Sequence, residues 1–529
     1  MKRKAALSVI FCLVITFSAI NVISRETAEP FFNLVLIPYE GGGVRSDYGL
    51  YIAQYLREIG IEAEVPIDDT WIWPIIVNPY TSDDFDLTLT SIPNIKTHDL
   101  RSFYTEDGSL NIFRLNRSIP FQNESETMQN EAVSMSDLEE RQQLYYDWQI
   151  LMMDQILPLL PLFSSKTYEA IWANTNGFEA CWGLIDSLPY IEYDGYHDGQ
   201  ESLTEFNVAD ANWRDLNPLQ DDNPASIFLS KLMSESIVGW SPDFVPIKTS
   251  LVTDWKMIDE FHYTFTMRDD VYWNPSFNVT GRISSSIPLD VATTPLMAGL
   301  KNNEVSIGTN LRVKAKDAVF TYLAWANPIV SECSTDFNWI SSVYVDPVDD
   351  MVFHVEIDAN PETSELEPYV DFWGSLPLCI LPEFFLNSSN PTISYTSGGA
   401  ECTGFYESIL DTDPWVIYSI SAFNCGKYML DYYIKNSVTV LQASPYWMGF
   451  GSIDGTEQDL DIDTVNVRVI PDITAELAEF KAGKLDLVDI SFFPAERKQM
   501  QTDSSFEVQS YVNYDFSFLV FNMERENIG

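Results

Sequence analysis

The sequence predicts an α/β protein with at least two lobes. The chain has 529 residues, which is more than one hydrophobic core can organise, so two or more lobes are expected from length alone. Strand patterns and helix patterns are mixed along the chain, without the short internal period of a solenoid. Hydrophobic residues make up 46% of the chain and aromatic residues 14%, which supplies large cores and excludes a disordered protein.

The first α/β unit lies near the start of the chain. The pattern predicts a buried strand over 33–38, a helix over 47–59 that Gly60 ends, and a second strand over 61–65. The glycines at 41–43 form the intervening loop; a nucleotide-binding loop is a poorer interpretation, because the full glycine spacing and the Lys-Ser/Thr pair are missing. The large apolar residues of the helix fall on one face: Tyr48, Tyr51, Ile52, Tyr55, Leu56 and Ile59.

Similar patterns continue further along the chain. A helix is predicted to begin at Ser136, where Glu139 stands at the capping-box distance, and to run until Pro158. A buried strand over 159–163 follows, and the polar stretch around 190–203 is typical of a linker. Half-buried strands are predicted over 263–267, 352–356, 437–441 and 464–470, and helices over 314–326 and 472–481.

The first residues predict export from the cytoplasm. Met1 to Lys4 carry three basic side chains, and residues 5–24 carry no charge. This layout is typical of a signal peptide or an amino-terminal membrane anchor over residues 1–24; a cleaved signal is favoured, because the far flank lacks strong charge. The mature chain is therefore expected at the cell surface or secreted, and membrane-associated if the anchor is retained. Asn-x-Ser/Thr triplets at Asn116, Asn123, Asn278 and Asn387 suit an exported protein.

The charge balance excludes one class of partner. Against 78 acidic residues stand 30 basic ones, and the formal net charge of -48 repels phosphate backbones, so no nucleic acid is expected. A solvated acidic surface explains the composition. Calcium binding is the sharper alternative, but the acidic stretch from Asp459 to Asp463 lacks the glycine turn and terminal glutamate of a calcium loop.

The sequence contains few groups for catalysis or metal binding. The four histidines share no metal-ligand spacing with cysteine or carboxylate residues, and neither Gly-x-Ser-x-Gly nor a zinc-protease helix occurs. We therefore expect no enzyme, no cofactor and no metal. A secreted glycoside hydrolase stays a minor alternative, because carboxylates are so numerous. Five of the six cysteines follow the leader, which allows at most two disulfides and leaves one thiol over.

Several segments between residues 263 and 522 resemble a known family and follow one another in the family's order. They are Tyr263-Thr-Phe-Thr-Met-Arg268, Val271-Tyr-Trp273, Lys314-Ala-Lys-Asp-Ala-Val-Phe-Thr-Tyr322, Cys425-Gly-Lys-Tyr428, Ser444-Pro-Tyr-Trp447, Ala482-Gly-Lys-Leu-Asp486 and Leu519-Val-Phe-Asn522. Together they resemble the extracellular solute-binding proteins of family 5, whose members bind peptides, nickel or oligosaccharides for ABC importers. Lys427 stands where the family usually has proline, and Ser444 where it usually has asparagine.

The order of the resembling segments is permuted. Residues 32–190 resemble the carboxy-terminal half of the family, which comprises the second lobe and the return to the first lobe. Residues 191–203 form a linker, and residues 204–529 resemble the amino-terminal half. That half is a first lobe with an inserted subdomain at about 256–410, and it ends at the interlobe crossing. A circular permutant and a fragment of a longer or tandem protein both explain this order.

The resemblance implies both a fold and a function. The fold is periplasmic-binding-protein-like, class II: two mixed-sheet lobes plus an extra α+β subdomain. The function is capture of a small-molecule, peptide or oligosaccharide ligand by lobe closure, followed by delivery to an ABC permease with a cytoplasmic ATPase. A surface receptor or scaffold that keeps the lobes without transport is the alternative.

The resemblance also indicates where the ligand would bind. Peptide-binding relatives anchor the ligand's amino terminus with an aspartate, but Asn94 lies near that position, and an amide cannot neutralise an ammonium group. Oligosaccharide is therefore as strong an expectation as oligopeptide, and nickel is disfavoured by the few histidines. The expected contacts combine aromatic walls with amide anchors; ordinary core packing is the alternative for each aromatic. They are Trp71, Trp73, Asn94, Phe423, Asn424 and Tyr514.

Overall fold

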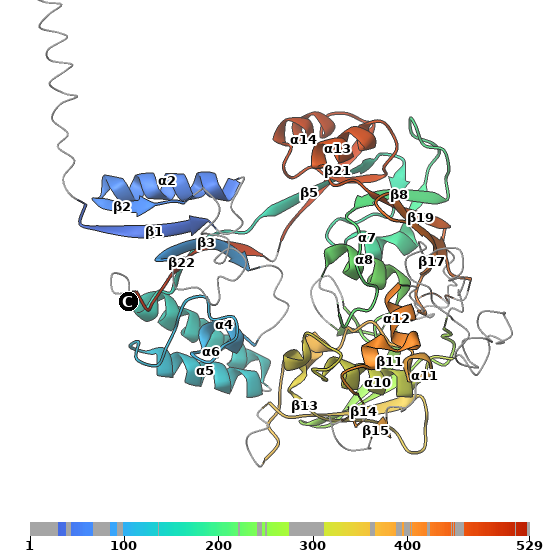
Figure 1. Ribbon diagram of the computed structural model, residues 1–529, viewed down its shortest axis with the longest axis horizontal. Helices are drawn as coiled ribbons and strands as arrows, with labels where there is room; N and C mark the ends of the chain where they lie inside the picture. The colour runs from blue at the N-terminus through green and yellow to red at the C-terminus, as the bar shows by residue number, and fades with distance from the viewer. Residues whose placement is uncertain are drawn as a thin grey trace, which may run out of the picture.

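A computed structural model shows the chain as two lobes joined by paired strands (Figure 1). The small lobe comprises residues 30–163 and 515–525, and the large lobe comprises residues 165–513. The structure describes residues 30–38, 44–66, 85–92, 99–135, 137–220, 223–240, 246–248, 251–273, 312–359, 365–387, 394–395, 402–403, 405–420, 424–445, 447, 449, 460–513 and 515–525.

The small lobe is built on a five-stranded mixed sheet. Its order is β2 (Ile61–Glu64), β1 (Phe32–Pro38), β3 (Leu87–Ile92), β22 (Phe516–Phe521) and β4 (Leu159–Phe163). Strand β1 pairs in parallel with β2 and β3, whereas β22 is antiparallel to both of its neighbours. The strand that returns from the large lobe therefore lies inside this sheet, between β3 and β4.

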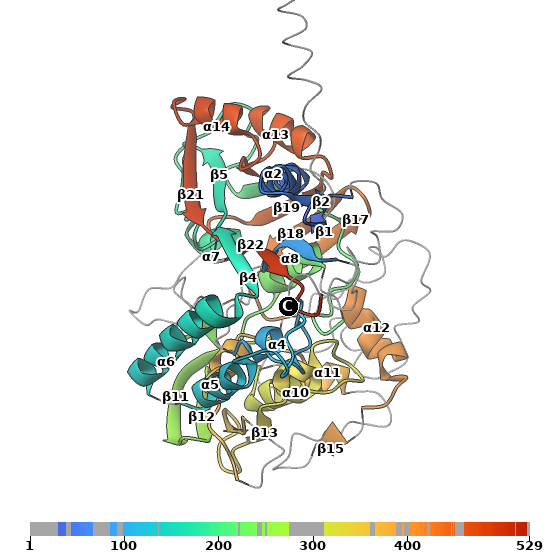
Figure 2. The ribbon, with the colours of Figure 1, turned by 90° about the vertical axis from the view of Figure 1, so that its left-hand side faces the viewer.

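Helices cover both faces of the small-lobe sheet (Figures 1 and 2). Helix α2 (Val44–Glu58) lies on one face; α4 (Arg101–Tyr104), α5 (Gln122–Ser134) and α6 (Leu138–Leu151), which continues into the π-helical turn η1 (Met152–Ile156), lie on the other. Because successive side chains of β22 point to opposite faces of the sheet, the strand contributes to the cores on both faces. Leu519 joins the core under α2, while Phe518 and Val520 join the core that contains Trp148.

Both strands and the helix of the first predicted unit are confirmed, but the buried face of the helix is not the predicted one. Ile52 and Leu56 pack on the sheet core, whereas Tyr51, Tyr55 and Ile59 are 58%, 64% and 64% exposed. The prediction for 159–163 is also half right. Strand β4 forms there, yet only Leu159 of the strand is buried, because β4 is an edge strand.

Helix α6 begins close to the predicted position. Asp137 caps it, accepting hydrogen bonds from the backbone N–H groups of Glu139 and Glu140 at 3.0 Å each. Its carboxylate satisfies two of the donors that a helix start leaves unpaired. Ser136, the predicted cap, lies outside the described residues.

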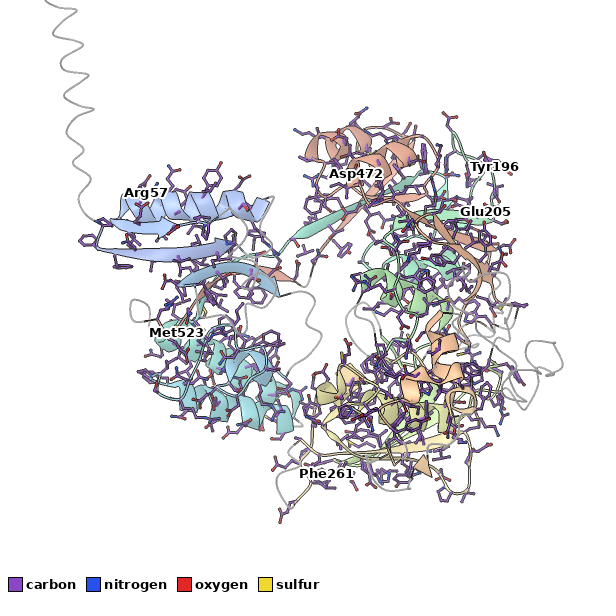
Figure 3. All side chains as sticks on the ribbon, in the orientation of Figure 1. Arg57, Tyr196, Glu205, Phe261, Asp472 and Met523 are labelled. Atoms are coloured by element: carbon purple, nitrogen blue, oxygen red, sulfur yellow. The ribbon has the colours of Figure 1, made fainter. Side chains whose placement is uncertain are left out.

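The part of the large lobe next to the crossing is a three-stranded sheet. Its order is β20 (Leu487–Asp489), β5 (Lys166–Trp172) and β21 (Phe506–Val512), all antiparallel. Helices α13 (Ile473–Lys481) and α14 (Pro494–Met500) cover one face (Figure 1). The core between them contains Trp172, Phe480, Val488 and Met500. Figure 3 labels Asp472, the residue that caps α13 by accepting a hydrogen bond from Ala475 N at 2.8 Å.

A four-stranded sheet continues the large lobe. It consists of β17 (Tyr428–Ile434), β18 (Val438–Ala443), β19 (Thr464–Val469) and β8 (Glu205–Asp210), with β19 and β8 parallel. Short helix α7 (Leu184–Ser187) and helix α8 (Pro224–Met233) pack beside it. Hairpin β6 (Thr175–Asn176) and β7 (Glu192–Tyr193) lies at its margin. The segment 191–203, expected as a linker, is held there by His197, whose ring stacks on Trp172 at 4.1 Å between centroids.

A subdomain completes the large lobe. Its antiparallel sheet has the order β11 (Val252–Asp259), β12 (His262–Met267), β14 (Val352–Ile357) and β13 (Ile340–Val345). Helix α10 (Ala315–Trp325) packs on one face of this sheet, around Phe265 and Phe353. Phe261, in the turn between β11 and β12, lies at the outer end of the subdomain (Figure 3). Short elements border it: β9 (Gly239–Trp240), β10 (Pro246–Ile247), α11 (Glu383–Leu386), α12 (Asp413–Ile420), β15 (Ser394–Tyr395) and β16 (Cys402–Thr403).

This architecture confirms the predicted fold class. Both lobes contain mixed sheets with helices, and an antiparallel α+β subdomain is added to the larger one. The predicted strands at 263–267, 352–356, 437–441 and 464–470 and the predicted helices at 314–326 and 472–481 are all present, with ends shifted by one or two residues.

Candidate functional site

The two chain segments that connect the lobes are tied to each other by polar side chains. Residues 164–165 connect β4 to β5, and residues 513–515 connect β21 to β22. The hydroxyl of Ser165 donates to the carboxylate of Asp515 at 2.9 Å, and the backbone N–H of Asn513 donates to the Ser165 carbonyl at 2.9 Å. The amide of Asn513 also donates to Thr167 Oγ1 at 2.9 Å. The crossing is therefore a short two-stranded ribbon whose two chains are joined side by side.

The three-stranded sheet β20-β5-β21, which lies beside this ribbon, carries different side chains on its two faces. Tyr168, Ala170 and Trp172 point to the core under α13 and α14, as alternation along β5 requires. On that side the guanidinium carbon of Arg497 lies 3.9 Å from the centroid of the Tyr168 ring, a cation–π contact. The opposite face, turned away from α13 and α14, carries Glu169.

Two carboxylates stand opposite each other on that face. Glu169 on β5 stands directly across from Asp489 on β20, so their side chains lie on the same side of the sheet. Burial, and secondly the negative charge of Asp489, raise the pKa of Glu169 to about 7. Glu476 lies on α13, which covers the other face, and burial together with the charges of Asp489 and Asp210 raises its pKa to about 7 as well.

This face combines hydrogen-bond acceptors with a donor. Glu169 Oε2 is buried and has no hydrogen-bond partner among the described residues. Burial and the negative charge of Glu169 raise the pKa of the Tyr511 hydroxyl, which keeps the phenol protonated as a donor. The face therefore presents carboxylate acceptors and a phenol O–H donor, groups that recognise amides and sugar hydroxyls equally well.

Of the six expected contact residues, the structure describes one. Asn424 is 3% exposed, and its side-chain oxygen accepts a hydrogen bond from the Tyr418 hydroxyl at 3.1 Å. Its described contacts are therefore those of a core residue beside β17. The other five lie outside the described residues: Trp71, Trp73, Asn94, Phe423 and Tyr514.

Sequence reasoning missed Glu169, Asp489 and Tyr511. They come from β5, β20 and β21, and β5 is separated from each of the other two strands by more than 300 residues of sequence. The sequence offered only a local signal, the alternation of side chains that is typical of a strand over 167–172. One face of this strand carries Thr167 and Glu169 next to Ile171, and the other carries Tyr168, Ala170 and Trp172.

The described histidines make structural contacts. His197 Nε2 lies 3.3 Å from the buried carboxylate of Asp486. His262 Nε2 lies 2.8 Å from His354 Nδ1, and His354 Nε2 lies 3.0 Å from Asp346. In the described part of the chain, no three His, Cys, Asp or Glu side chains converge as a metal site.

Among the described cysteines, Cys181, Cys379 and Cys425 are not part of a disulfide. None of the helices in the described ranges has the length and apolar character needed to cross a bilayer.

Two lobes with mixed sheets, connected by a paired-strand ribbon, define a class of protein that holds a solute between its lobes. Residues 246–528, more than half of the chain, match the model of bacterial extracellular solute-binding proteins, family 5 Middle. The chain belongs to this family, whose members are binding proteins that work outside the cytoplasm, and its fold is the predicted periplasmic-binding-protein-like class II. None of the curated protein sequences matches the chain.

The chain is also similar to parts of several solved structures. NikZ from Campylobacter jejuni, in complex with Ni(L-His), is 17% identical, with a TM-score of 0.36, and the match covers 56% of this chain and 45% of NikZ. The oligopeptide-binding protein AppA from Bacillus subtilis, in complex with a nonapeptide, is 15% identical, with a TM-score of 0.35 and coverages of 53% and 43%. DppA from Helicobacter pylori, in complex with the peptide STSA, is 14% identical, with a TM-score of 0.35 and coverages of 53% and 45%. The match thus spans less than half the length of each of these proteins.

Proposed function

We propose that this protein is the solute-binding component of an ABC-type importer and captures an oligopeptide or an oligosaccharide outside the cytoplasm by lobe closure. The observation that carries the proposal is the paired-strand crossing. Two short segments, 164–165 and 513–515, connect lobes whose main sheets pack in separate cores. Such a connection lets the lobes rotate as rigid bodies about the ribbon. Membership in family 5 supports the same function.

The chemistry near the crossing favours a polar solute. Glu169 and Asp489 offer acceptors, and Tyr511 offers a donor, on the sheet face next to the ribbon. Peptide amides and sugar hydroxyls both match this set. The proposed contact residues are those expected from the sequence, with Trp71, Trp73 and Tyr514 stacking on the solute and Asn94, Phe423 and Asn424 completing the contacts.

A thermal-shift screen of the purified mature chain tests the proposal. Oligopeptides and oligosaccharides are tested as separate sets, and we expect one set to raise the melting temperature, because a ligand that binds only the folded state stabilises it. Calorimetry then measures Kd, and mass spectrometry checks that the solute is recovered unchanged. Consumption of the solute, or no shift with either set, would contradict a binding protein for these solutes.

Tryptophan variants test the contact residues. Trp71→Ala and Trp73→Ala should each weaken binding by about tenfold, the loss expected for one stacked ring, without lowering the melting temperature of the free protein. The matched control is Trp182→Ala, since Trp182 is 42% exposed and contacts Tyr190 in the large lobe. Equal affinity for the three variants would remove Trp71 and Trp73 from the site.

A further inference from the structure

The lobes also touch each other on the side opposite the crossing strands. There the α4–α6 layer of the small lobe approaches the subdomain of the large lobe (Figures 1 and 2). The Tyr369 hydroxyl of the subdomain donates to Asp99 Oδ2 of the small lobe at 3.1 Å. The next residue, Val370, donates its backbone N–H to the carbonyl of Val133, the penultimate residue of α5, at 3.0 Å.

Each side of this contact is held in place by a residue of its own lobe. On the small lobe, Arg101 clamps the Asp99 carboxylate with two hydrogen bonds, Nε to Oδ1 at 2.9 Å and Nη2 to Oδ2 at 2.7 Å. Burial opposes ionisation of Asp99, but the hydrogen bonds from Arg101 outweigh it, and the pKa of this carboxyl is lowered. On the large lobe, Tyr369 is 9% exposed, and its ring stacks on that of the buried Trp339.

The charge state of each partner suits the hydrogen bond. Burial, and secondly the charges of Asp99 and Asp371, raise the pKa of Tyr369, so its O–H stays available as a donor. Arg101 compensates the charge of Asp99, so the bond forms without adding to the repulsion expected between parts of a chain with a net charge of -48. Val133 is 2% exposed and belongs to the hydrophobic core of the large lobe.

We infer that Asp99, Arg101, Tyr369 and the Val133–Val370 backbone bond form a latch that holds the lobes together in the absence of solute. Rotation about the crossing ribbon moves the far side of the lobes most, so this contact must break first when the lobes separate. The latch therefore sets how much of the free protein is open. That it also slows solute entry and release rests on the proposed function.

Solution scattering of the solute-free protein tests the latch. Tyr369→Phe removes the hydroxyl but keeps the ring, and we expect its radius of gyration to rise by about 1 Å above that of the wild-type protein. The matched control is Tyr344→Phe, which removes a hydroxyl that donates to Glu356 at 3.4 Å within the subdomain, and it should leave the radius unchanged. Equal radii for wild type and Tyr369→Phe would overturn the latch.

A cysteine pair gives an independent measurement in a chain that keeps Asp99 and Tyr369. Val133→Cys combined with Val370→Cys should form a disulfide under mild oxidation, identified by peptide mass spectrometry so that links to native cysteines are recognised. In the control pair, Val133→Cys with Val348→Cys, the second residue is 93% exposed beyond the far end of β13, and no link should form. Absence of the 133–370 link would overturn the latch. The proposed function would stand, because a solute can still close lobes that are open when free.

Discussion

Glu169 and Asp489 face each other across neighbouring antiparallel strands, and burial together with this like charge raises the pKa of Glu169 to about 7. The unfolded chain lacks both effects, so its glutamate titrates near the usual value of about 4.5. The folded protein therefore holds more protons than the unfolded chain between these two values. The contribution of Glu169 to stability is complete below about pH 4.5 and is lost as the pH rises through about 7.

Glu169→Gln should remove this pH dependence. At about pH 5 the variant and the wild type should have similar free energies of unfolding, and at about pH 8 the variant should be more stable by about 2 kcal/mol, because an amide needs no ionisation. Chemical denaturation at both pH values measures the difference. Glu507→Gln, at an exposed position of β21, is the control and should have the same effect at both. If the wild type were as stable as Glu169→Gln at the higher pH, ionisation of Glu169 beside Asp489 would not cost folding free energy.

At the scale of single residues, the sequence indicates which kinds of side chain a binding site would use more readily than where each of them lies in the fold. Asn424 is expected at the ligand; its buried side chain accepts a hydrogen bond from Tyr418, and burial of this kind depends on the packing of distant segments. Glu169 was not expected, because its partner Asp489 is 320 residues away in the chain and their pairing follows from sheet order alone. The contact predictions for all six residues remain predictions: Trp71, Trp73, Asn94, Phe423, Asn424 and Tyr514.

At the scale of elements, hairpin β6–β7 depends on one glycine. Gly177 has a φ of +80°, and a Cβ at this position would lie 1.8 Å from the carbonyl oxygen of Tyr190, the residue just before Ile191 and β7. A contact of that length with backbone cannot be relieved by a side-chain rotation. The backbone must move instead, and the hydrogen bond from Ile191 N to Leu188 O, which shapes the turn before β7, lies next to the clash.

Gly177→Ala should therefore destabilise the large lobe by about 3 kcal/mol or more, the sum of the positive-φ penalty and the displaced backbone. Gly195→Ala separates the two contributions. Gly195 has the same φ of +80° but nothing within 4 Å of an added Cβ, so only the conformational penalty of about 1 kcal/mol remains. Thermal unfolding monitored by tryptophan fluorescence compares the two variants. Equal losses would mean that the turn adapts to a side chain at 177.

Local patterns predicted the elements well where period and caps agree. Strands β12, β14, β18 and β19 and helices α10 and α13 appear within two residues of their expected ends, since alternation, capping residues and closing glycines act within a few positions. Which face is buried was harder to predict. Tyr51 and Tyr55 have the spacing of an inward stripe on α2, yet they are exposed, because the sheet under α2 reaches only the side that carries Ile52 and Leu56.

At the scale of the whole molecule, the two lobes were predicted from the length and from the family resemblance, but their contacts were not. The latch joins Asp99 to Tyr369, which lie 270 residues apart, and the ribbon joins Ser165 to Asp515, which lie 350 residues apart. No local pattern relates such positions. Contacts between residues so far apart in the chain form only when complete lobes pack, so no single segment determines them.

The net charge of -48 affects the whole molecule, and it predicts how stability responds to salt. At low ionic strength the screening length is about 30 Å, so negative charges repel one another across each lobe; at about 1 M salt it falls to about 3 Å and the repulsion disappears. Repulsion is stronger in the compact folded state than in the expanded unfolded chain. The melting temperature should therefore rise by about 3 °C or more between about 10 mM and about 1 M sodium chloride.

Potassium chloride at equal ionic strength should give the same rise, because screening does not depend on the identity of a monovalent cation. A larger rise with calcium chloride at matched ionic strength would indicate specific cation binding instead, and a melting temperature that falls or stays constant would mean that ion pairs such as those of Arg117 with Glu106, Asp107 and Glu126 outweigh the repulsion.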